Sequence, residues 1–411
     1  MSGAAARGKM MPENLEHDVL IVGAGLAGLW AASALGRRGV RVLLVDHKRE
    51  VSASVATTGI FVRRSLESFH LPEDCLGPPV RHVRMHSPSG RVLALESGRD
   101  EFRVGRMGPL YQRLLTGARA LGVTWSPATH FEGCETSVRG SVVWLRRNGQ
   151  SIRARTRFIL GADGARSRVA TALSLDSNFA WIVGVEDVVV DVPLEGPPCF
   201  HCFLDPEIAP GYLGWLVHDG AEVHIGVAGN PARFAARDAL EKLRVRARRI
   251  VPLERGRLVE RRGGWIPVNG VLRSIVNSHG MLLGDAAGAV SPLTAGGLDP
   301  CLRLSEFAAG QVAEYLRSGD REALAELQGR RFRTRYRGRL TLRRLWSRLE
   351  SRRAMEIVSV LLGTPPGRWL ARRVFFGPGS FPDPETTRSL PYLTFRTGSA
   401  DSEFPIPLRR R

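Results

Sequence analysis

The chain has 411 residues, of which 43% are hydrophobic and 24% are charged, a balance typical of packed globular proteins with more than one domain. The formal net charge is +19, but the basic residues are spread along the chain, with only three lysines among 59. Because no basic motif with interleaved aromatic residues accompanies this charge, we do not expect nucleic-acid binding.

The sequence also indicates where the protein works. No uninterrupted apolar stretch reaches the roughly 18 residues of a membrane-spanning helix, and residues 1–17 lack the apolar run of a secretory signal. Five cysteines, an odd number, favour reduced thiols over a disulfide framework. We therefore expect a cytoplasmic protein, and its basic charge leaves a peripheral contact with an anionic membrane open.

The first predicted elements form a βαβ unit. Residues 18–22 are an apolar run long enough for one buried strand, a helix rich in alanine and leucine is expected over 29–38, and a second strand over 41–45. A glycine motif joins the first strand to the helix, as in dinucleotide-binding proteins. The predicted nucleotide-binding residues of this unit are Gly23, Gly25, Leu26, Ala27, Gly28 and Asp46.

Each of these positions has a mechanical reason. Gly23 permits a tight turn, Gly25 lets a pyrophosphate approach the backbone, and Gly28 allows close packing of the helix on the strand. The phosphate charge then meets the helix N-terminus. Asp46 ends the second strand about 20 positions after the glycines, where a carboxylate accepts the ribose hydroxyls and disfavours a 2′-phosphate.

The βαβ unit does not by itself choose between FAD and NAD, and later segments bear on that choice. An apolar strand over 157–160 is followed by Asp163 and Gly164, and another over 280–283 is followed by Gly284 and Asp285. A carboxylate at the end of a parallel strand points into the crevice where nucleotides bind. Gly296 and Gly297 precede a predicted helix over 302–316, whose N-terminus would stabilise negative charge.

In this order, the three segments resemble the fingerprints of the flavoproteins that include the aromatic-ring hydroxylases and the geranylgeranyl reductases. The resemblance implies FAD as the cofactor. It places Asp163 and Gly164 near the pyrophosphate and the nicotinamide approach, and Gly284 and Asp285 at the ribityl chain. It also places Gly296 and Gly297 near N1 and O2 of the flavin. Arg106, which leads a predicted helix over 105–121, matches a family arginine beside the cofactor.

The same resemblance implies an α/β fold class, in which a Rossmann-type FAD-binding domain of three-layer ββα architecture is discontinuous in sequence. Strand-like runs such as 181–190 and 222–227 predict an antiparallel-sheet substrate domain. The expected divisions are 15–75, 100–178 and 265–327 for the FAD domain, 76–99 and 179–264 for the sheet domain, and 328–411 for a basic helical extension.

Two features lie outside the fingerprints. Residues 328–362 alternate apolar side chains with arginines, so this helical stretch either packs on its own protein, which we favour, or lies on a membrane surface. The chain after residue 363 is expected to be irregular. Cys199 and Cys202 form a lone C-x-x-C in an apparent strand, which favours packing over a metal or redox site.

The segment 210–218 resembles a geranylgeranyl reductase segment, although Val217 and His218 stand where that family has Phe-Pro. Tyr212 and Trp215 are expected to wall an apolar pocket, although a core tyrosine and tryptophan would give the same pattern. His218 is the nearby side chain that can exchange a proton near neutral pH. A Thr-Thr-Gly at 57–59 replaces the Cys-Gly pair of many relatives.

The leading hypothesis is an FAD-dependent oxidoreductase that transfers hydride between flavin and a carbon–carbon double bond of a hydrophobic, isoprenoid-like substrate. The alternatives are an FAD-dependent aromatic monooxygenase and a non-catalytic FAD-binding scaffold. A flavin halogenase is disfavoured because none of the three lysines is placed to face the flavin. Since no second complete glycine motif follows a strand, the reductant is left open between NAD(P)H and an electron-donor protein.

Overall fold

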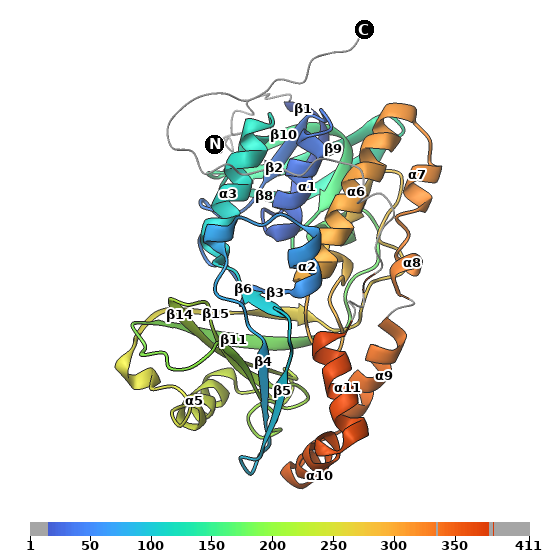
Figure 1. The fold of residues 1–411 in the computed structure, drawn as a ribbon. Helices are drawn as coiled ribbons and strands as arrows, with labels where there is room; N and C mark the ends of the chain where they lie inside the picture. The colour runs from blue at the N-terminus through green and yellow to red at the C-terminus, as the bar shows by residue number, and fades with distance from the viewer. Residues whose placement is uncertain (1–14, 334–335, 378–380, 382–411) are drawn as a thin grey trace, which may run out of the picture.

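The protein has two stacked parts, each built around a seven-stranded sheet (Figure 1). A computed structural model describes residues 15–333, 336–377 and 381. The first sheet contains the N-terminal βαβ unit. The second sheet contains Trp215 in one of its strands, and Tyr212 lies just before that strand. No helix within these described ranges is both long and apolar enough to cross a lipid bilayer.

The first sheet combines parallel and antiparallel pairing. In spatial order its strands are β7 (Thr124–Ser126), β2 (Val42–Val45), β1 (Leu15–Val22), β10 (Gln150–Gly161), β9 (Gly140–Arg147) and β8 (Thr129–Ser137), with β16 (Gly280–Leu282) also paired to β10. Strand β10 runs parallel to β1 and β16 but antiparallel to β9. It therefore joins a Rossmann-type layer to an antiparallel layer, as expected for a ββα architecture.

Helix α1 (Leu26–Gly36) lies between the first sheet and two longer helices, α3 (Met107–Ala120) and α6 (Leu298–Ser318). Every residue of α1 from Leu26 to Leu35 is buried. A helix with apolar surroundings on all sides needs no polar face, which explains its alanine- and leucine-rich sequence. The buried helix holds its N-terminus at the carboxyl end of β1, where the glycine motif lies.

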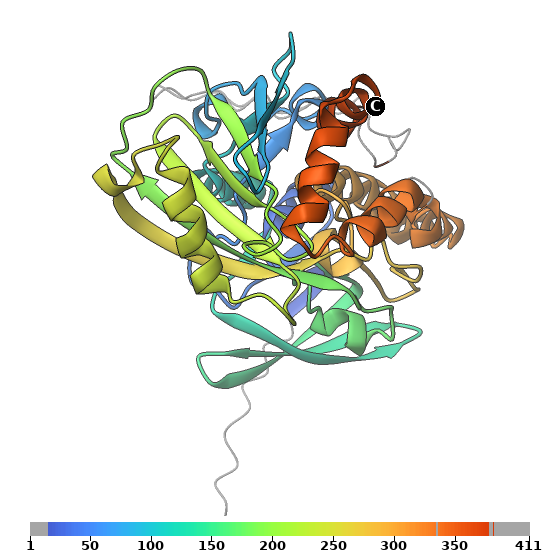
Figure 2. The same cartoon turned by 90° about the horizontal axis from the view of Figure 1, so that it is seen from below.

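The second sheet carries Trp215 and His218 in one of its strands. Its strands, in spatial order, are β15 (Arg257–Pro267), β11 (Trp181–Val190), β14 (Glu222–Gly229), β13 (Gly214–His218), β12 (Cys199–Phe203), β4 (His82–His86) and β5 (Val92–Glu96). Helix α5 (Ala236–Ala247) packs on the face turned away from the first sheet (Figures 1 and 2). Leu216, Ile225 and Leu243 belong to the core under α5. The opposite face is turned toward the first sheet.

The second sheet differs from the expected one in two respects. Strands β4 and β12 pair in parallel, so the sheet is mixed rather than antiparallel throughout. The expectation was wrong here because a long connection separates these strands, and strand patterns do not reveal the direction of such a distant pairing. Strand β15 also runs three residues beyond the expected boundary at residue 264, and Trp265–Pro267 pair with β11.

The basic C-terminal region forms helices α8 (Gly329–Arg333), α9 (Arg337–Trp346), α10 (Arg352–Gly363) and α11 (Pro365–Phe376). The expectation of an irregular chain after residue 363 was wrong for α11. Thr364 caps this helix by accepting from the Gly367 amide, and Pro365 occupies its first turn, where a missing N–H costs nothing. Residues 382–411 of the expected extension lie outside the described ranges.

Short elements complete the described chain. Strands β3 (Ile60–Val62) and β6 (Phe102–Val104) form a two-stranded sheet between the two parts (Figure 1). The remaining helical segments are α2 (Arg63–Ser68), η1 (Glu73–Cys75), α4 (Arg168–Ala172), η2 (Leu253–Arg255), η3 (Gly284–Ala287) and α7 (Glu322–Ala325). All five cysteines carry free thiols, and Cys199 and Cys202 are buried in β12, as their packing interpretation predicts.

Candidate FAD and substrate site

The glycine turn after β1 contains two glycines that packing requires and one that it does not. A Cβ at Gly23, where φ is +102°, would lie 2.2 Å from the Ala162 carbonyl oxygen. A Cβ at Gly28 would lie 1.8 Å from the Gly23 carbonyl oxygen. At Gly25, the N-cap of α1, a Cβ would meet nothing within 4 Å. Open space in front of an uncapped helix N-terminus suits a pyrophosphate.

The first turn of α1 and the end of β2 face this space. Leu26 and Ala27 are buried at the start of α1, so their side chains anchor the turn while Gly25 leaves the helix end without a side-chain cap. The Asp46 carboxylate accepts from the Ala24 amide at 2.6 Å and the Lys48 amide at 2.8 Å. These bonds hold a buried carboxylate beside the glycine turn, where a ribose would bind.

Asp163 follows β10 on the other side of the turn. Its carboxylate accepts from the Ser167 hydroxyl at 2.6 Å and the Arg168 amide at 2.7 Å, so it caps the start of α4. Burial raises the pKa of Asp163, which these bonds partly counter. Gly164 has φ of +82°, a conformation that favours glycine. The structure therefore gives both residues a role in shaping the loop beside Gly23.

Asp285 lies next to both glycine-rich turns. Gly284 packs so closely on α1 that a Cβ there would lie 3.0 Å from the Ala27 Cβ. A Cβ at Gly297 would lie 3.5 Å from the Asp285 Oδ1. Burial raises the pKa of the Asp285 carboxyl to about 6. A desolvated carboxylate at this position fits a ligand that brings hydroxyl donors, such as the ribityl chain of FAD.

The turn that opens α6 contacts the segment that contains Tyr212. Gly297 is the N-cap of α6, and the Gly296 carbonyl accepts from the Ser291 amide at 3.0 Å. The Tyr212 hydroxyl donates to the Thr294 carbonyl at 2.6 Å. The second sheet and the turn before α6 are therefore in direct contact at Tyr212.

Tyr212 and Trp215 form one apolar wall. Buried Tyr212 packs in a cluster with Ile182, Ala228 and Val268, and Trp215 lies against this cluster. Trp215 donates from Nε1 to the Glu186 Oε2 at 2.8 Å. Burial raises the pKa of the Tyr212 phenol, so this hydroxyl donates a hydrogen bond and stays protonated at neutral pH.

His218 and Arg106 lie apart from that wall. His218 and Trp215 are three residues apart on β13, so strand alternation places them on opposite faces. Burial lowers the pKa of His218, and its Nδ1 has no hydrogen-bond partner in the described part of the chain. Arg106, the N-cap of α3, pairs with Asp219 through Nε at 3.6 Å. The structure thus connects Arg106 to the end of the second sheet.

The prediction from sequence missed a set of buried polar residues on the inner face of the second sheet. Glu186, Asp219 and His224 are almost fully buried, and Arg262 donates to the Thr57 carbonyl at 2.8 Å. The sequence could have indicated them, since Glu186 and His224 lie within strands that are mostly apolar. Charged groups in buried strands need partners, which only the folded chain reveals.

Comparison with known proteins gives the same fold. A digeranylgeranylglycerophospholipid reductase of Methanothrix thermoacetophila is 28% identical over 318 residues, which cover 74% of this chain and 79% of the relative. A geranylgeranyl bacteriochlorophyll reductase-like protein from Thermoplasma acidophilum has a TM-score of 0.78 at 19% identity, over 88% of this chain and 97% of that chain. The p-nitrophenol 4-monooxygenase of Pseudomonas putida has a TM-score of 0.66 at 18% identity, over 88% and 93% of the two chains.

These similarities confirm the fold class and the resemblance to the geranylgeranyl reductase-like flavoproteins. The family model described as FAD binding domain matches residues 16–331, and the residues of both glycine-rich turns lie within that match. The open space at Gly25 and the desolvated Asp285 fit the same cofactor. The chain therefore belongs to the FAD binding domain family, and its cofactor is FAD.

Proposed function

We propose that this FAD-dependent oxidoreductase transfers hydride between flavin and a carbon–carbon double bond of a hydrophobic, isoprenoid-like substrate. The observation that carries the proposal is the contact between the Tyr212 hydroxyl and the Thr294 carbonyl, because it sets an apolar wall against the flavin-side turn. The name of the Methanothrix relative, a digeranylgeranylglycerophospholipid reductase, supports the substrate class.

Bound FAD supplies the hydride acceptor or donor, and the chain holds and shields it. The open N-terminus of α1 would bind the pyrophosphate. The Asp46 carboxylate would accept hydrogen bonds from the ribose, and the Asp285 carboxylate would accept them from the ribityl hydroxyls. We propose the following residues for FAD: Gly23, Gly25, Leu26, Ala27, Gly28, Asp46, Arg106, Asp163, Gly164, Gly284, Asp285, Gly296 and Gly297. The first sheet with its helices would then be the FAD domain, and the second sheet the substrate domain.

Tyr212 and Trp215 would orient the substrate and exclude water. Their neighbours Ile182, Ala228 and Val268 are apolar, so this part of the wall offers contact area without competing hydrogen bonds. We keep His218 as a third candidate, but its side chain lies on the other face of β13 and does not point toward that wall. The reductant stays open between NAD(P)H and an electron-donor protein.

The reaction can be tested with reduced enzyme and a lipid that carries geranylgeranyl chains, mixed without oxygen. We expect flavin reoxidation and a product with two more hydrogens for each double bond reduced. Trp215→Ala should raise KM about tenfold, the equivalent of about 1.4 kcal/mol, while Trp215→Phe should retain most of the apolar contact. Incorporation of labelled dioxygen into an aromatic product would instead establish a monooxygenase. Flavin that neither NADPH, NADH nor reduced ferredoxin reduces would favour a scaffold.

We also propose a peripheral contact with an anionic membrane through α10 and α11. Met355 of α10 and Ala371 of α11 are buried, and Val358, Leu362, Phe375 and Phe376 also pack on the protein, so one face of these helices is covered and other apolar side chains stay exposed. Ile357 and Trp369 are 63% and 64% exposed. The arginines of these helices are Arg352, Arg353, Arg368, Arg372 and Arg373. Exposed apolar side chains among arginines suit an anionic lipid surface.

Vesicle binding tests this contact. Replacement of Ile357 and Trp369 together by Glu should weaken sedimentation with anionic vesicles by about tenfold or more, since each buried side chain contributes roughly 1.5–3 kcal/mol. Val138→Glu is the matched control, because Val138 is an exposed apolar residue in the β8–β9 turn. Equal binding of the double variant and the wild type, or no binding to anionic vesicles at all, would contradict the proposal.

A further inference from the structure

A buried charge cluster, defined as Thr58, Glu186, Asp219, His224 and Arg262, lies on the inner face of the second sheet. One row of residues crosses three strand pairs of this sheet, from Arg262 through Glu186 and Gly226 to Trp215. A Cβ at Gly226 would lie 2.2 Å from the Trp215 ring. The missing side chain therefore lets the indole cross over the strand and reach the Glu186 carboxylate.

Glu186 connects the apolar wall to the first part of the protein. Its Oε2 accepts from the Trp215 Nε1 at 2.8 Å and also from the Thr58 hydroxyl. Arg262, opposite Glu186 in the neighbouring strand, donates to the Thr57 carbonyl at 2.8 Å. The loop at residues 55–59 and the Trp215 indole are thus held by one carboxylate and its partner arginine.

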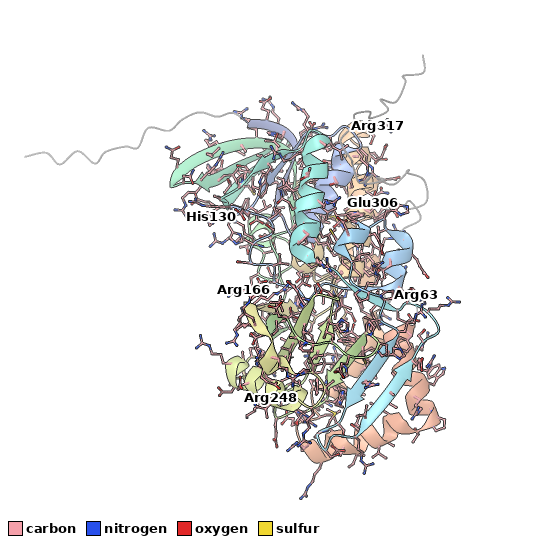
Figure 3. The ribbon with its side chains drawn as sticks, turned by 60° about the vertical axis from the view of Figure 1, so that its left-hand side comes forward. Arg63, His130, Arg166, Arg248, Glu306 and Arg317 are labelled. Atoms are coloured by element: carbon pink, nitrogen blue, oxygen red, sulfur yellow. The ribbon has the colours of Figure 1, made fainter. Side chains whose placement is uncertain are left out.

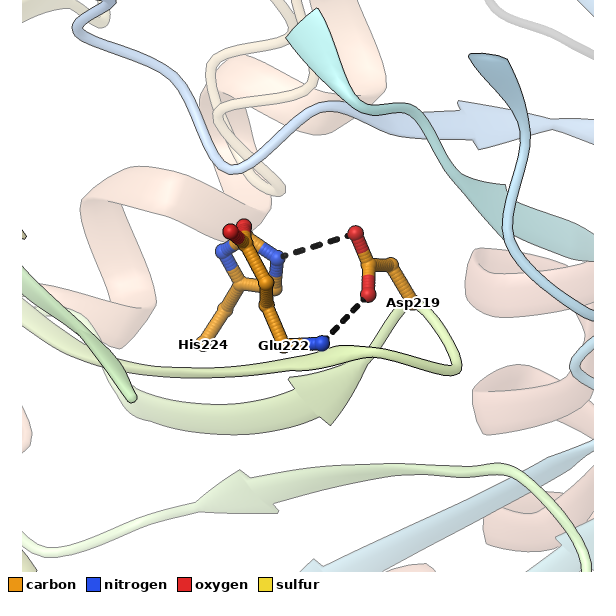
Figure 4. A group of neighbouring side chains, drawn as sticks. All are labelled: Asp219, Glu222 and His224. Carbon is orange, nitrogen blue, oxygen red and sulfur yellow. Dashed lines mark hydrogen bonds and ion pairs between the residues drawn. The ribbon is translucent and has the colours of Figure 1, made fainter. Parts of the chain in front are cut away.

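His224 lies between two carboxylates. Its Nδ1 is 3.5 Å from the Glu186 Oε1. Its Nε2 is 4.0 Å from the Asp219 Oδ2, and Figure 4 shows this ion pair. A neutral imidazole would turn a lone pair toward one of these carboxylates, whereas an imidazolium offers a proton to each. Burial by itself lowers the pKa of His224, but Asp219 and Glu186 outweigh it and raise the pKa to about 9.

Other charged groups surround the same ring. Arg262 on β15 lies 3.4 Å from the Glu186 Oε1, and Arg106 before α3 lies 3.6 Å from Asp219. The titratable and charged groups around His224 are Glu186, Asp219, Glu222, Arg262 and Arg106. His218 lies on the other face of β13 and acts on His224 only electrostatically. The two guanidinium groups help to keep Glu186 and Asp219 ionised at neutral pH.

A metal ion is the alternative occupant of this place. Asp219, Glu222 and His224 offer ligand atoms that lie within 4.8 Å of one another. Arg106 and Arg262 disfavour a divalent cation there, because both guanidinium groups lie within ion-pair distance of the cluster's carboxylates. The imidazolium of His224 has one N–H toward each carboxylate and carries a single positive charge, whereas a divalent cation would bring two.

We propose that Glu186 is a positioning residue for the substrate wall, and that protonated His224, held by Asp219, keeps the Glu186 carboxylate in place for Trp215 and the 55–59 loop. This inference rests on the proposed function, because it assumes that Trp215 contacts the substrate. It assigns no chemical step to Glu186 or His224. Both act through Trp215 and Thr58.

The test is Glu186→Gln in the FAD-loaded protein, with Asp187→Asn as the matched control. Asp187 is equally buried and pairs with Arg261 at 2.6 Å and Arg244 at 2.9 Å, but on the opposite face of β11. We expect Glu186→Gln to raise KM about tenfold, as loss of a charged hydrogen bond would, with little change in kcat. Glu186→Asp should recover part of that loss. Asp187→Asn should lower Tm and leave KM unchanged.

A second readout is the pH profile. In the wild type, KM should rise as the pH passes about 9, because His224 then loses its proton. In His224→Gln, KM should already be raised at pH 7 and should not rise further as the pH passes about 9. An unchanged KM in Glu186→Gln would overturn the proposal if Trp215→Ala still raises KM. If Trp215→Ala also leaves KM unchanged, the proposed pocket fails instead. One equivalent of divalent metal, present in the wild type and lost in His224→Gln, would overturn the proton assignment.

Discussion

Gly25 and Gly28 are three residues apart, but the structure requires them for different reasons. A Cβ at Gly28 would overlap the Gly23 carbonyl, whereas a Cβ at Gly25 would project into open space. We expect Gly28→Ala to lower the free energy of unfolding by about 1–3 kcal/mol through overpacking. Gly25→Ala should fold normally but weaken FAD binding about tenfold. Thermal unfolding of cofactor-stripped protein and flavin titration separate the two effects, and equal unfolding of both variants would contradict the assignment.

The raised pKa of Asp285 predicts how FAD binding depends on pH. Burial raises this pKa from 3.8 to about 6, so the folded protein without cofactor takes up a proton where the unfolded chain does not, and its stability falls as the pH rises through that window. Because hydrogen bonds from the ribityl hydroxyls favour the ionised Asp285 carboxylate, FAD affinity should fall about tenfold per pH unit below 6. Asp285→Asn should bind FAD more weakly at pH 7.5 and lack this dependence. A wild-type affinity that is constant from pH 5 to pH 7.5 would rule out the role.

At the scale of elements, α1 and α6 are joined by one carboxylate. Glu306 of α6 accepts from the Trp30 indole of α1 at 2.9 Å and pairs with Arg37 and Arg38, which directly follow α1, at 3.2 and 3.1 Å (Figure 3 labels Glu306). These groups are largely buried, with Glu306 12% exposed. Glu306→Ala would leave two arginines side by side without their partner.

We expect Glu306→Ala to lower the free energy of unfolding by about 1–3 kcal/mol, less than a fully buried pair because the arginines keep some solvent. Denaturant unfolding measures the change. Glu314→Ala is a control on the same helix, since Glu314 forms an exposed pair with Arg317 and should contribute about 0–1 kcal/mol. Equal effects of the two substitutions would show that the contact between α1 and α6 does not depend on Glu306.

The elements also show what strand and helix patterns can predict. The strand expected over 181–190 is β11, and the strand expected over 222–227 is contained in β14. Both runs are rich in valine and isoleucine, which is a local property. Helix α11 was missed because its sequence contains prolines and arginines, and the prolines lie in the first turn, where a helix tolerates them.

At the scale of the whole molecule, the residues proposed for FAD come from segments that are far apart in sequence. Asp46, Asp163, Asp285 and Gly297 come from four separate segments of the first part. The Arg166 guanidinium, close after Asp163, lies over the Trp265 ring of the second sheet, 5.6 Å from the ring centroid. Figure 3 shows Arg166 at the level where the two parts meet. A ligand that binds this arrangement and not the unfolded chain stabilises the whole fold.

We therefore expect FAD at 100 times its Kd to stabilise the stripped protein by about 2.7 kcal/mol and to raise Tm by about 3 °C or more. FMN is the control, because it lacks the adenosine that would bind at Asp46 and the glycine turn, and its shift should be smaller. Differential scanning fluorimetry measures both. An identical shift with FMN and FAD would show that the N-terminal βαβ unit does not contribute to binding.

The sequence alone determined the βαβ unit and the glycine-rich turns, because glycine spacing and apolar strands act over a few neighbouring residues. The FAD cofactor was implied by the resemblance of three such segments to the fingerprints of a flavoprotein family. Only the tertiary structure decided that β4 pairs with β12 in parallel, that Trp215 crosses Gly226 to reach Glu186, and that His224 lies between two carboxylates. Each of these depends on at least one distant partner, such as Glu186, which is 29 residues from Trp215. A buried charge in a strand signals that such a partner exists, but the fold decides which one it is.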